Sequence, residues 1–151
     1  MSTAEKEALL ADLEALEKAR HLDRCRGDFL YFCHTVYPEF KEGPHHRQMR
    51  KHLVQLLAGD ITRLTVSMPP RFGKSVTIAY LFVAWYLGKH PTHHIMMETH
   101  TAALSADFGR KVRNLIDSPT YREIFPDTVV SRDKSAADDW STSLGGKYLA
   151  V

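Results

Sequence analysis

The stretch TRLTVSMPPRFGKS, residues 62–75, decides the fold of this chain. Residues 62–68 are rich in β-branched side chains, which predicts a short buried strand. A turn at 69–73 follows at once, and the strongly apolar segment 74–87 after it predicts a helix. A strand, a sharp turn and a helix in this order form the setting in which backbone N–H groups bind phosphate.

The turn contains the residue types that a phosphate-binding loop requires. Gly73, Lys74 and Ser75 form its core: the lysine can reach the β- and γ-phosphates, and the serine hydroxyl can hold Mg²⁺. Met68 replaces the glycine that usually stands five residues before Gly73, so the loop is a deviant form. The residues predicted to bind the nucleotide here are Pro69, Pro70, Arg71, Phe72, Gly73, Lys74 and Ser75.

Alternatives remain for individual residues. Lys74 and Arg71 are predicted to act in catalysis, Arg71 by stabilising charge on the γ-phosphate; alternatively, Arg71 pairs with a carboxylate and holds the loop. Gln48 is predicted to contact adenine through its amide, which both donates and accepts; the alternative is a polar residue on an exposed helix. If the loop binds no phosphate, Lys74 and Ser75 are surface residues at the start of a helix.

The rest of the chain supports an α/β fold. Periodicity and turn residues predict helices at 3–23, 28–36, 46–58 and 101–117, a strand at 93–99, and a hairpin at 140–151. Strands and helices in this rhythm predict a parallel sheet. The first helix carries leucines at three- and four-residue steps, which predicts packing on the domain or on a partner. Its apolar repeat is too short to favour a coiled coil.

Residues 69–75 (PPRFGKS) resemble the deviant Walker A loop of large terminase subunits from tailed phages and prophages. Segments elsewhere resemble the same family in order and spacing: 40–48, 84–91, 108–113, 124–126 and 140–148. The first of these resembles the family's adenine-side segment. The resemblance spans 29–151 and divides the chain into an N-terminal helical segment, 1–60, and part of a P-loop ATPase core, 61–151.

The resemblance implies a P-loop NTPase of the additional-strand type, with ATP and Mg²⁺ as cofactors. It implies the ATP-binding part of a motor that packages double-stranded DNA into a capsid. Expected partners are DNA, the portal protein, a small terminase subunit and further copies in a ring, in the host-cell cytoplasm and transiently at the procapsid portal. The alternatives are a remnant that binds nucleotide or partners without catalysis and, less favoured, another P-loop enzyme such as a helicase.

Two acids that hydrolysis requires are expected beyond Val151, in the family's Walker B strand, together with a nuclease domain. One acid holds magnesium and the other orients the attacking water. We therefore expect residues 1–151 alone to hydrolyse ATP very slowly or not at all. Asp138 and Asp139 follow no apolar strand and Glu98 ends the second predicted strand, so none of them is predicted to be catalytic.

Composition narrows the remaining classes. A net charge of +2 neither requires nor excludes a nucleic-acid partner. Two cysteines are too few for a disulfide scaffold or a four-ligand zinc site, and the scattered histidines lack the spacing of zinc ligands. No apolar stretch is long enough to span a membrane. Arg110, Lys111 and Arg113 form a basic cluster that either contacts DNA phosphates or is a solvated helix face.

Overall fold

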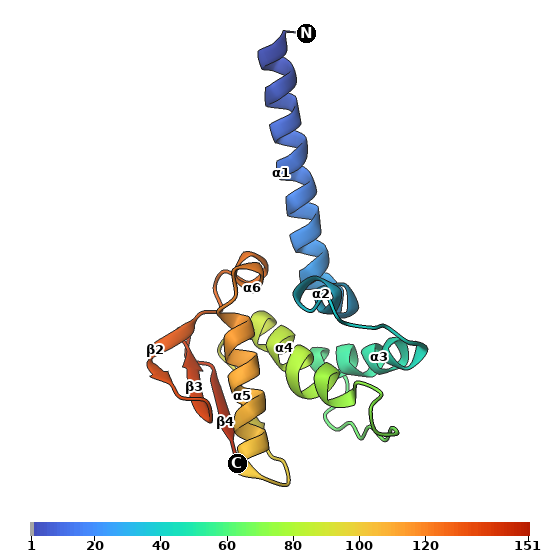
Figure 1. Ribbon diagram of the computed structural model, residues 1–151, viewed down its shortest axis with the longest axis vertical. Helices are drawn as coiled ribbons and strands as arrows, with labels where there is room; N and C mark the ends of the chain where they lie inside the picture. Colours follow the sequence, from blue (N-terminus) through green and yellow to red (C-terminus); the bar gives the residue numbers. More distant parts are fainter. Residues whose placement is uncertain (1) are drawn as a thin grey trace.

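A long helix, α1 (Thr3–Gly27), projects from the rest of the molecule in a computed structural model that describes residues 2–151 (Figure 1). A capping box starts it: the Ser2 side chain accepts from the Glu5 N–H, and the Glu5 carboxylate accepts from the Ser2 N–H. The helix prediction is confirmed. Packing on the domain is confined to its C-terminal part, where Cys25 is buried, and the leucines before it are about half exposed: Leu9, Leu10, Leu13 and Leu16.

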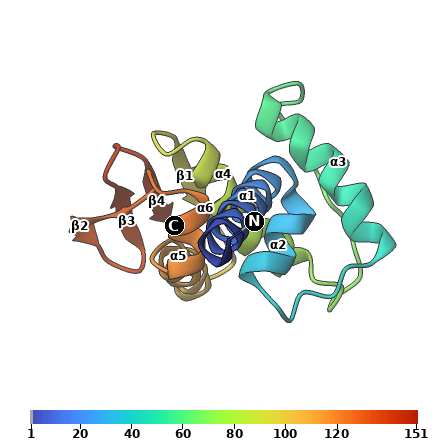
Figure 2. The ribbon, with the colours of Figure 1, turned by 90° about the horizontal axis from the view of Figure 1, so that it is seen from above.

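Two further helices complete the N-terminal part and confirm the predictions there. Helix α2 (Phe29–Val36) begins at Asp28, whose carboxylate accepts from the N–H groups of the first turn. Helix α3 (Pro44–Ala58) ends at Gly59, which adopts a left-handed conformation with φ 82°. Figures 1 and 2 place α3 on one side of the molecule and the sheet on the other.

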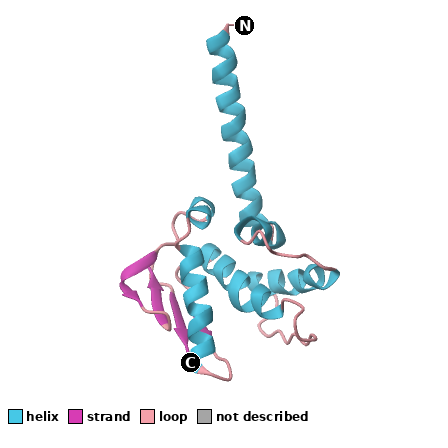
Figure 3. Ribbon diagram, viewed as in Figure 1, coloured by secondary structure: helices cyan, strands magenta, loops and turns pink. Residues whose placement is uncertain are grey.

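The strand predicted at 62–68 is wrong, because the segment that precedes the loop forms no strand. Leu64, Val66 and Met68 are half-buried and alternate with exposed residues, as in a strand with one buried face. The segment is drawn as loop in Figure 3 because it pairs with no strand among residues 2–151. Leu64 and Met68 still pack against the core. The alternating apolar side chains of this segment are therefore covered by the helical core rather than by a neighbouring strand.

The helix predicted at 74–87 is confirmed and forms the centre of the core. It starts at Lys74, widens into π-helical turns over η1 (Val76–Phe82) and continues as α4 (Val83–Lys89). Leu81, Ala84 and Leu87 are fully buried. Trp85 donates from its indole N–H to the Cys25 carbonyl at 3.0 Å. This bond joins the central helix to the buried end of α1.

The sheet is mixed rather than parallel, which corrects the sequence prediction. Its strands are β1 (His94–Met97), β2 (Val130–Ser135), β3 (Asp139–Thr142) and β4 (Lys147–Ala150), in the order β1-β4-β3-β2. Only β1 and β4 run parallel. The hairpin prediction is confirmed by β3 and β4, but β2 lies in a segment with weak periodicity and was not predicted. Its pairing with β3 depends on tertiary context that periodicity does not carry.

Helices α5 (Ala102–Ile116) and α6 (Pro119–Ile124) connect β1 to β2. The prediction for α5 is confirmed, and Thr101 caps it by accepting from the Leu104 N–H; the short α6 was not predicted. Gly109 lets α5 approach the sheet, because a Cβ there would lie 2.6 Å from the Tyr148 ring. Among residues 2–151, no helix combines the length and the apolar character needed to cross a membrane.

Candidate functional site

The loop before the central helix has an unusual backbone. Arg71 adopts φ 67° and Gly73 adopts φ 77°, so two residues separated by one are left-handed. Glycine adopts this conformation at little cost, whereas for arginine it is unfavourable. Strained backbone of this kind concentrates at functional sites. The turn reverses the chain so that a helix starts at Lys74, as the loop motif predicts.

The start of this helix presents free backbone donors. Its first hydrogen bond runs from the Thr77 N–H to the Gly73 carbonyl, at 2.9 Å. The N–H groups of residues 74–76 come before that bond and have no carbonyl partner within the helix. Lys74 is half-buried and Ser75 is exposed. Free N–H groups and the positive end of the helix dipole form a setting that attracts anions.

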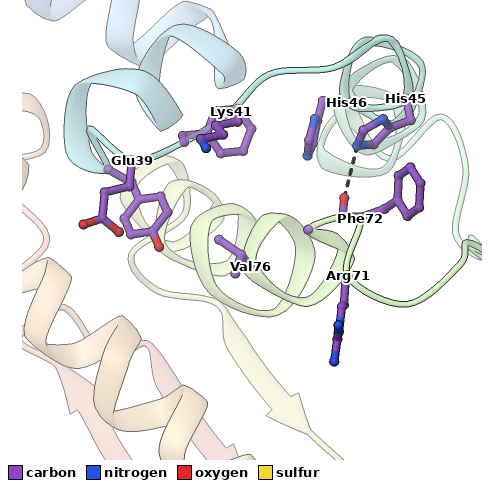
Figure 4. Close-up of a pocket in the computed structure, with 10 residues that line it drawn as sticks. Glu39, Lys41, His45, His46, Arg71, Phe72 and Val76 are labelled. Carbon is purple, nitrogen blue, oxygen red and sulfur yellow. Dashed lines mark hydrogen bonds between the residues drawn. The ribbon is translucent and has the colours of Figure 1, made fainter.

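A cavity of about 290 Å³ lies beside the loop (Figure 4). Its walls come from four residues of the segment 37–41, the first turn of α3, Arg71–Gly73 and Val76. Tyr37, Phe40 and Phe72 supply aromatic surface, whereas Lys41 adds a positive charge and Glu39 a negative one. The size is at the small end of ligand cavities. The cavity therefore combines apolar rings with backbone and side-chain donors.

Two adjacent histidines at the start of α3 connect it to the loop. The Nε2 of His45 lies 3.1 Å from the Phe72 carbonyl oxygen, the contact drawn in Figure 4. His46 is buried, and its Nδ1 accepts from the Gly43 N–H at 2.9 Å. From the sequence, both residues lie in the segment 40–48 that resembles the family's adenine-side segment and lack the spacing of zinc ligands, and neither is predicted to contact the loop. The Gly43-Pro44 helix start could have indicated His46, because the third helical residue often caps the residue before the helix.

The predicted binding residues are only partly brought together. Arg71, Phe72 and Gly73 line the cavity, although the exposed Arg71 side chain points away from both histidines (Figure 4). Gln48 lines a second cavity of about 260 Å³, between α3 and residues 64–68. His45 borders both cavities. Gln48 therefore lines a different cavity from Arg71, Phe72 and Gly73, and shares its cavity with Met68 at the start of the loop.

The acidic residues weighed as catalytic candidates have other surroundings. Asp139 lies 2.6 Å from the Lys134 ammonium and 3.7 Å from that of Lys147. The hydrogen bond from Lys134 lowers the pKa of the Asp139 carboxyl. Glu98 is exposed beyond the end of β1. Over residues 2–151, no three His, Cys, Asp or Glu side chains cluster as a metal site would require.

The basic side chains on α5 form ion pairs and hydrogen bonds with nearby residues. Arg110 and Lys111 form ion pairs with Asp107, at 3.2 and 2.8 Å. Arg113 donates to the Ser135 carbonyl. These contacts favour a helix face that stabilises its own surroundings over a surface reserved for DNA phosphates.

Comparison of the chain with protein-family models, with curated proteins and with solved structures gives no match. The fold and the site define an α/β protein with a candidate anion-binding loop.

Proposed function

We propose that the loop from Met68 to Ser75 binds ATP with Mg²⁺. The observation that carries the proposal is the pair of left-handed residues, Arg71 and Gly73, immediately before a helix that starts with Lys74 and Ser75. Backbone N–H groups at a turn before a helix start can converge on one point in front of the helix and bind an anion. A polyphosphate is the ligand whose charge and oxygen acceptors match such a point.

Each loop residue then has a distinct task. The N–H groups of residues 74–76 donate to phosphate oxygens, and the Lys74 ammonium adds a mobile positive charge. In this proposal the Ser75 hydroxyl holds Mg²⁺, which neutralises phosphate charge when bound. Arg71 is free to approach the γ-phosphate because its side chain is exposed. Gln48 and His45 then border the side on which a base would lie.

We further propose that the chain is the ATP-binding part of a terminase large subunit with a P-loop NTPase fold. The resemblance of residues 69–75 and the flanking segments supports this proposal. Double-stranded DNA, the portal protein, a small terminase subunit and ring neighbours are the partners that this role requires. The helix after the loop and β1 agree with the order of elements in that fold, whereas the unpaired segment 62–68 departs from it.

Calorimetric titration with Mg-ATP tests the binding proposal directly. We expect Lys74→Ala to weaken binding about 100-fold, because it removes charge-assisted hydrogen bonds worth about 1.5–3 kcal/mol. Lys51→Ala, on the exposed side of α3, is the matched control and should bind like the wild type. Failure of the wild type to bind Mg-ATP, or equal affinity of wild type and Lys74→Ala, would contradict the proposal.

Turnover separates the packaging ATPase from a protein that only binds nucleotide. We expect little phosphate release from residues 1–151 alone, since the two candidate acidic sites lie in a β3 ion pair and at an exposed strand end. The measurement is steady-state phosphate release with and without Lys74→Ala. Rapid release that the substitution abolishes would show that this chain already holds every catalytic group.

A further inference from the structure

A buried ring nitrogen next to the loop, the Nε2 of His46, has no hydrogen-bond partner among residues 2–151. His46 is only 4% exposed, and its Nδ1 accepts from the Gly43 N–H. Because a backbone N–H can only donate, Nδ1 must be unprotonated, so a neutral His46 ring carries its proton on Nε2. Burial, with a contribution from His45, lowers the pKa of His46 and favours this neutral form. The Nε2–H is therefore a fixed donor.

That donor points at the loop. Within residues 2–151, the His46 Nε2 has no partner, and a Cβ built on Gly73 would lie 3.2 Å from it. The buried Thr77 hydroxyl lies 4.0 Å from the same point and also lacks a partner. Leaving one such group unsatisfied costs about 1–3 kcal/mol. Two such donors, one from His46 and one from Thr77, lie beside Gly73 and indicate a place where a ligand supplies acceptors.

We propose that the Nε2–H of His46 donates a hydrogen bond to a phosphate oxygen of the nucleotide bound at the loop; this inference rests on the proposed function. Phosphate oxygens accept hydrogen bonds only, so a neutral donor suits them. Gly73 stands directly before Lys74, the residue predicted to reach the phosphates. Gly73 has no side chain that would fill the space between the His46 Nε2 and the loop.

Two substitutions at this position separate the donor from the helix cap. His46→Phe keeps a planar ring but removes both the donor and the capping acceptor. His46→Gln retains an amide oxygen that can accept from the Gly43 N–H, as glutamine does at this helix position, and an N–H₂ donor. His94→Phe is the matched control, because His94 is an exposed histidine of β1 that lines neither cavity.

Calorimetry with Mg-ATP and with Mg-tripolyphosphate provides the test. We expect His46→Phe to weaken both ligands by the same factor, tenfold or more, which corresponds to losing one hydrogen bond to a charged oxygen. His46→Gln should retain more affinity than His46→Phe, and His94→Phe should match the wild type. Equal binding by His46→Phe and wild type overturns the inference, and weakening of Mg-ATP alone places the donor at the base or sugar and overturns the phosphate assignment.

Lys74→Ala in the same titrations distinguishes nucleotide binding by the loop from the phosphate contact of His46. If Lys74→Ala loses binding while His46→Phe does not, the loop binds nucleotide and only the role of His46 fails. If the wild type binds neither ligand, both proposals fail. Should His46→Phe not fold, the ring nitrogens of the wild type are followed by ¹⁵N NMR. We expect the His46 Nε2 proton signal to shift downfield on saturation with tripolyphosphate, and an unchanged signal overturns the inference.

Discussion

The hairpin region and the loop region of this molecule treat their buried polar groups in opposite ways. Around β3 and β4, the Trp140 indole N–H donates to the Gly109 carbonyl at 3.1 Å, and the Tyr148 hydroxyl donates to the Ser105 carbonyl at 3.0 Å. The two rings stack with centroids 5.3 Å apart and an angle of 2° between planes. Each of these large side chains is both fully buried and hydrogen-bonded.

Around the loop, the His46 Nε2 and the Thr77 hydroxyl are buried and find no partner among the residues that the structure describes, and Arg71 is left-handed. A third unpartnered atom, the Asp139 Oδ1, belongs to the hairpin region, but its carboxylate pairs with Lys134. Because its large buried side chains are hydrogen-bonded, we infer that the hairpin region mainly stabilises the fold. The loop region keeps unsatisfied groups that a bound ligand can satisfy.

The largest effect is expected from Trp140→Ala. The substitution opens a cavity beside Tyr148 and removes the bond to Gly109, so we expect it to lower the free energy of unfolding by about 3–5 kcal/mol. Urea denaturation followed by circular dichroism measures this. Lys74→Ala, in the loop, should change stability by less than about 0.5 kcal/mol. A cost for Trp140→Ala below that of Lys74→Ala would break the comparison.

A smaller effect is expected from Thr142→Val in the hairpin. The buried Thr142 hydroxyl donates to the Pro91 carbonyl and accepts from the Gly146 N–H at 2.8 Å. Valine has almost the same shape, but it leaves both backbone groups without a partner. We therefore expect a loss of about 1–3 kcal/mol in the free energy of unfolding. Thr142→Ser, which keeps the hydroxyl, should cost less; equal costs would show that packing, not hydrogen bonding, makes Thr142 important.

Local signals explain most of what the sequence predicted correctly. The helices were predictable because apolar periodicity agrees with their caps, as at Gly59 and Thr101. The hairpin was predictable because strand-forming residues flank Gly145, whose φ is 91°. Sheet order was not predictable, because pairing of β4 with β1 joins segments about fifty residues apart.

The candidate site was predicted only in part, because some of its residues are neighbours in sequence and others meet only in the fold. Its loop is contiguous, so the turn before Lys74 could be predicted from the order of residues. The cavity could not be predicted, because it forms where the first turn of α3 meets a loop more than twenty residues later in the chain. The unpartnered state of His46 depends on this contact. The order of residues does not reveal that the Gly43 N–H donates to the His46 Nδ1 while the Nε2 of the same ring lies beside Gly73.

The smallest expected effect comes from Thr77→Val, the counterpart of Thr142→Val. Both threonines are buried, but the Thr77 hydroxyl has no partner within the part of the chain that the structure describes. Valine replaces an unsatisfied hydroxyl with a methyl group of similar size, and the two residues have similar helix propensities. We expect the free energy of unfolding to stay unchanged or to rise by up to about 1 kcal/mol. A loss as large as that of Thr142→Val, measured by the same urea denaturation, would mean that water already satisfies this hydroxyl. The loop region would then be as fully hydrogen-bonded as the hairpin, and the contrast between stability and ligand binding would no longer hold.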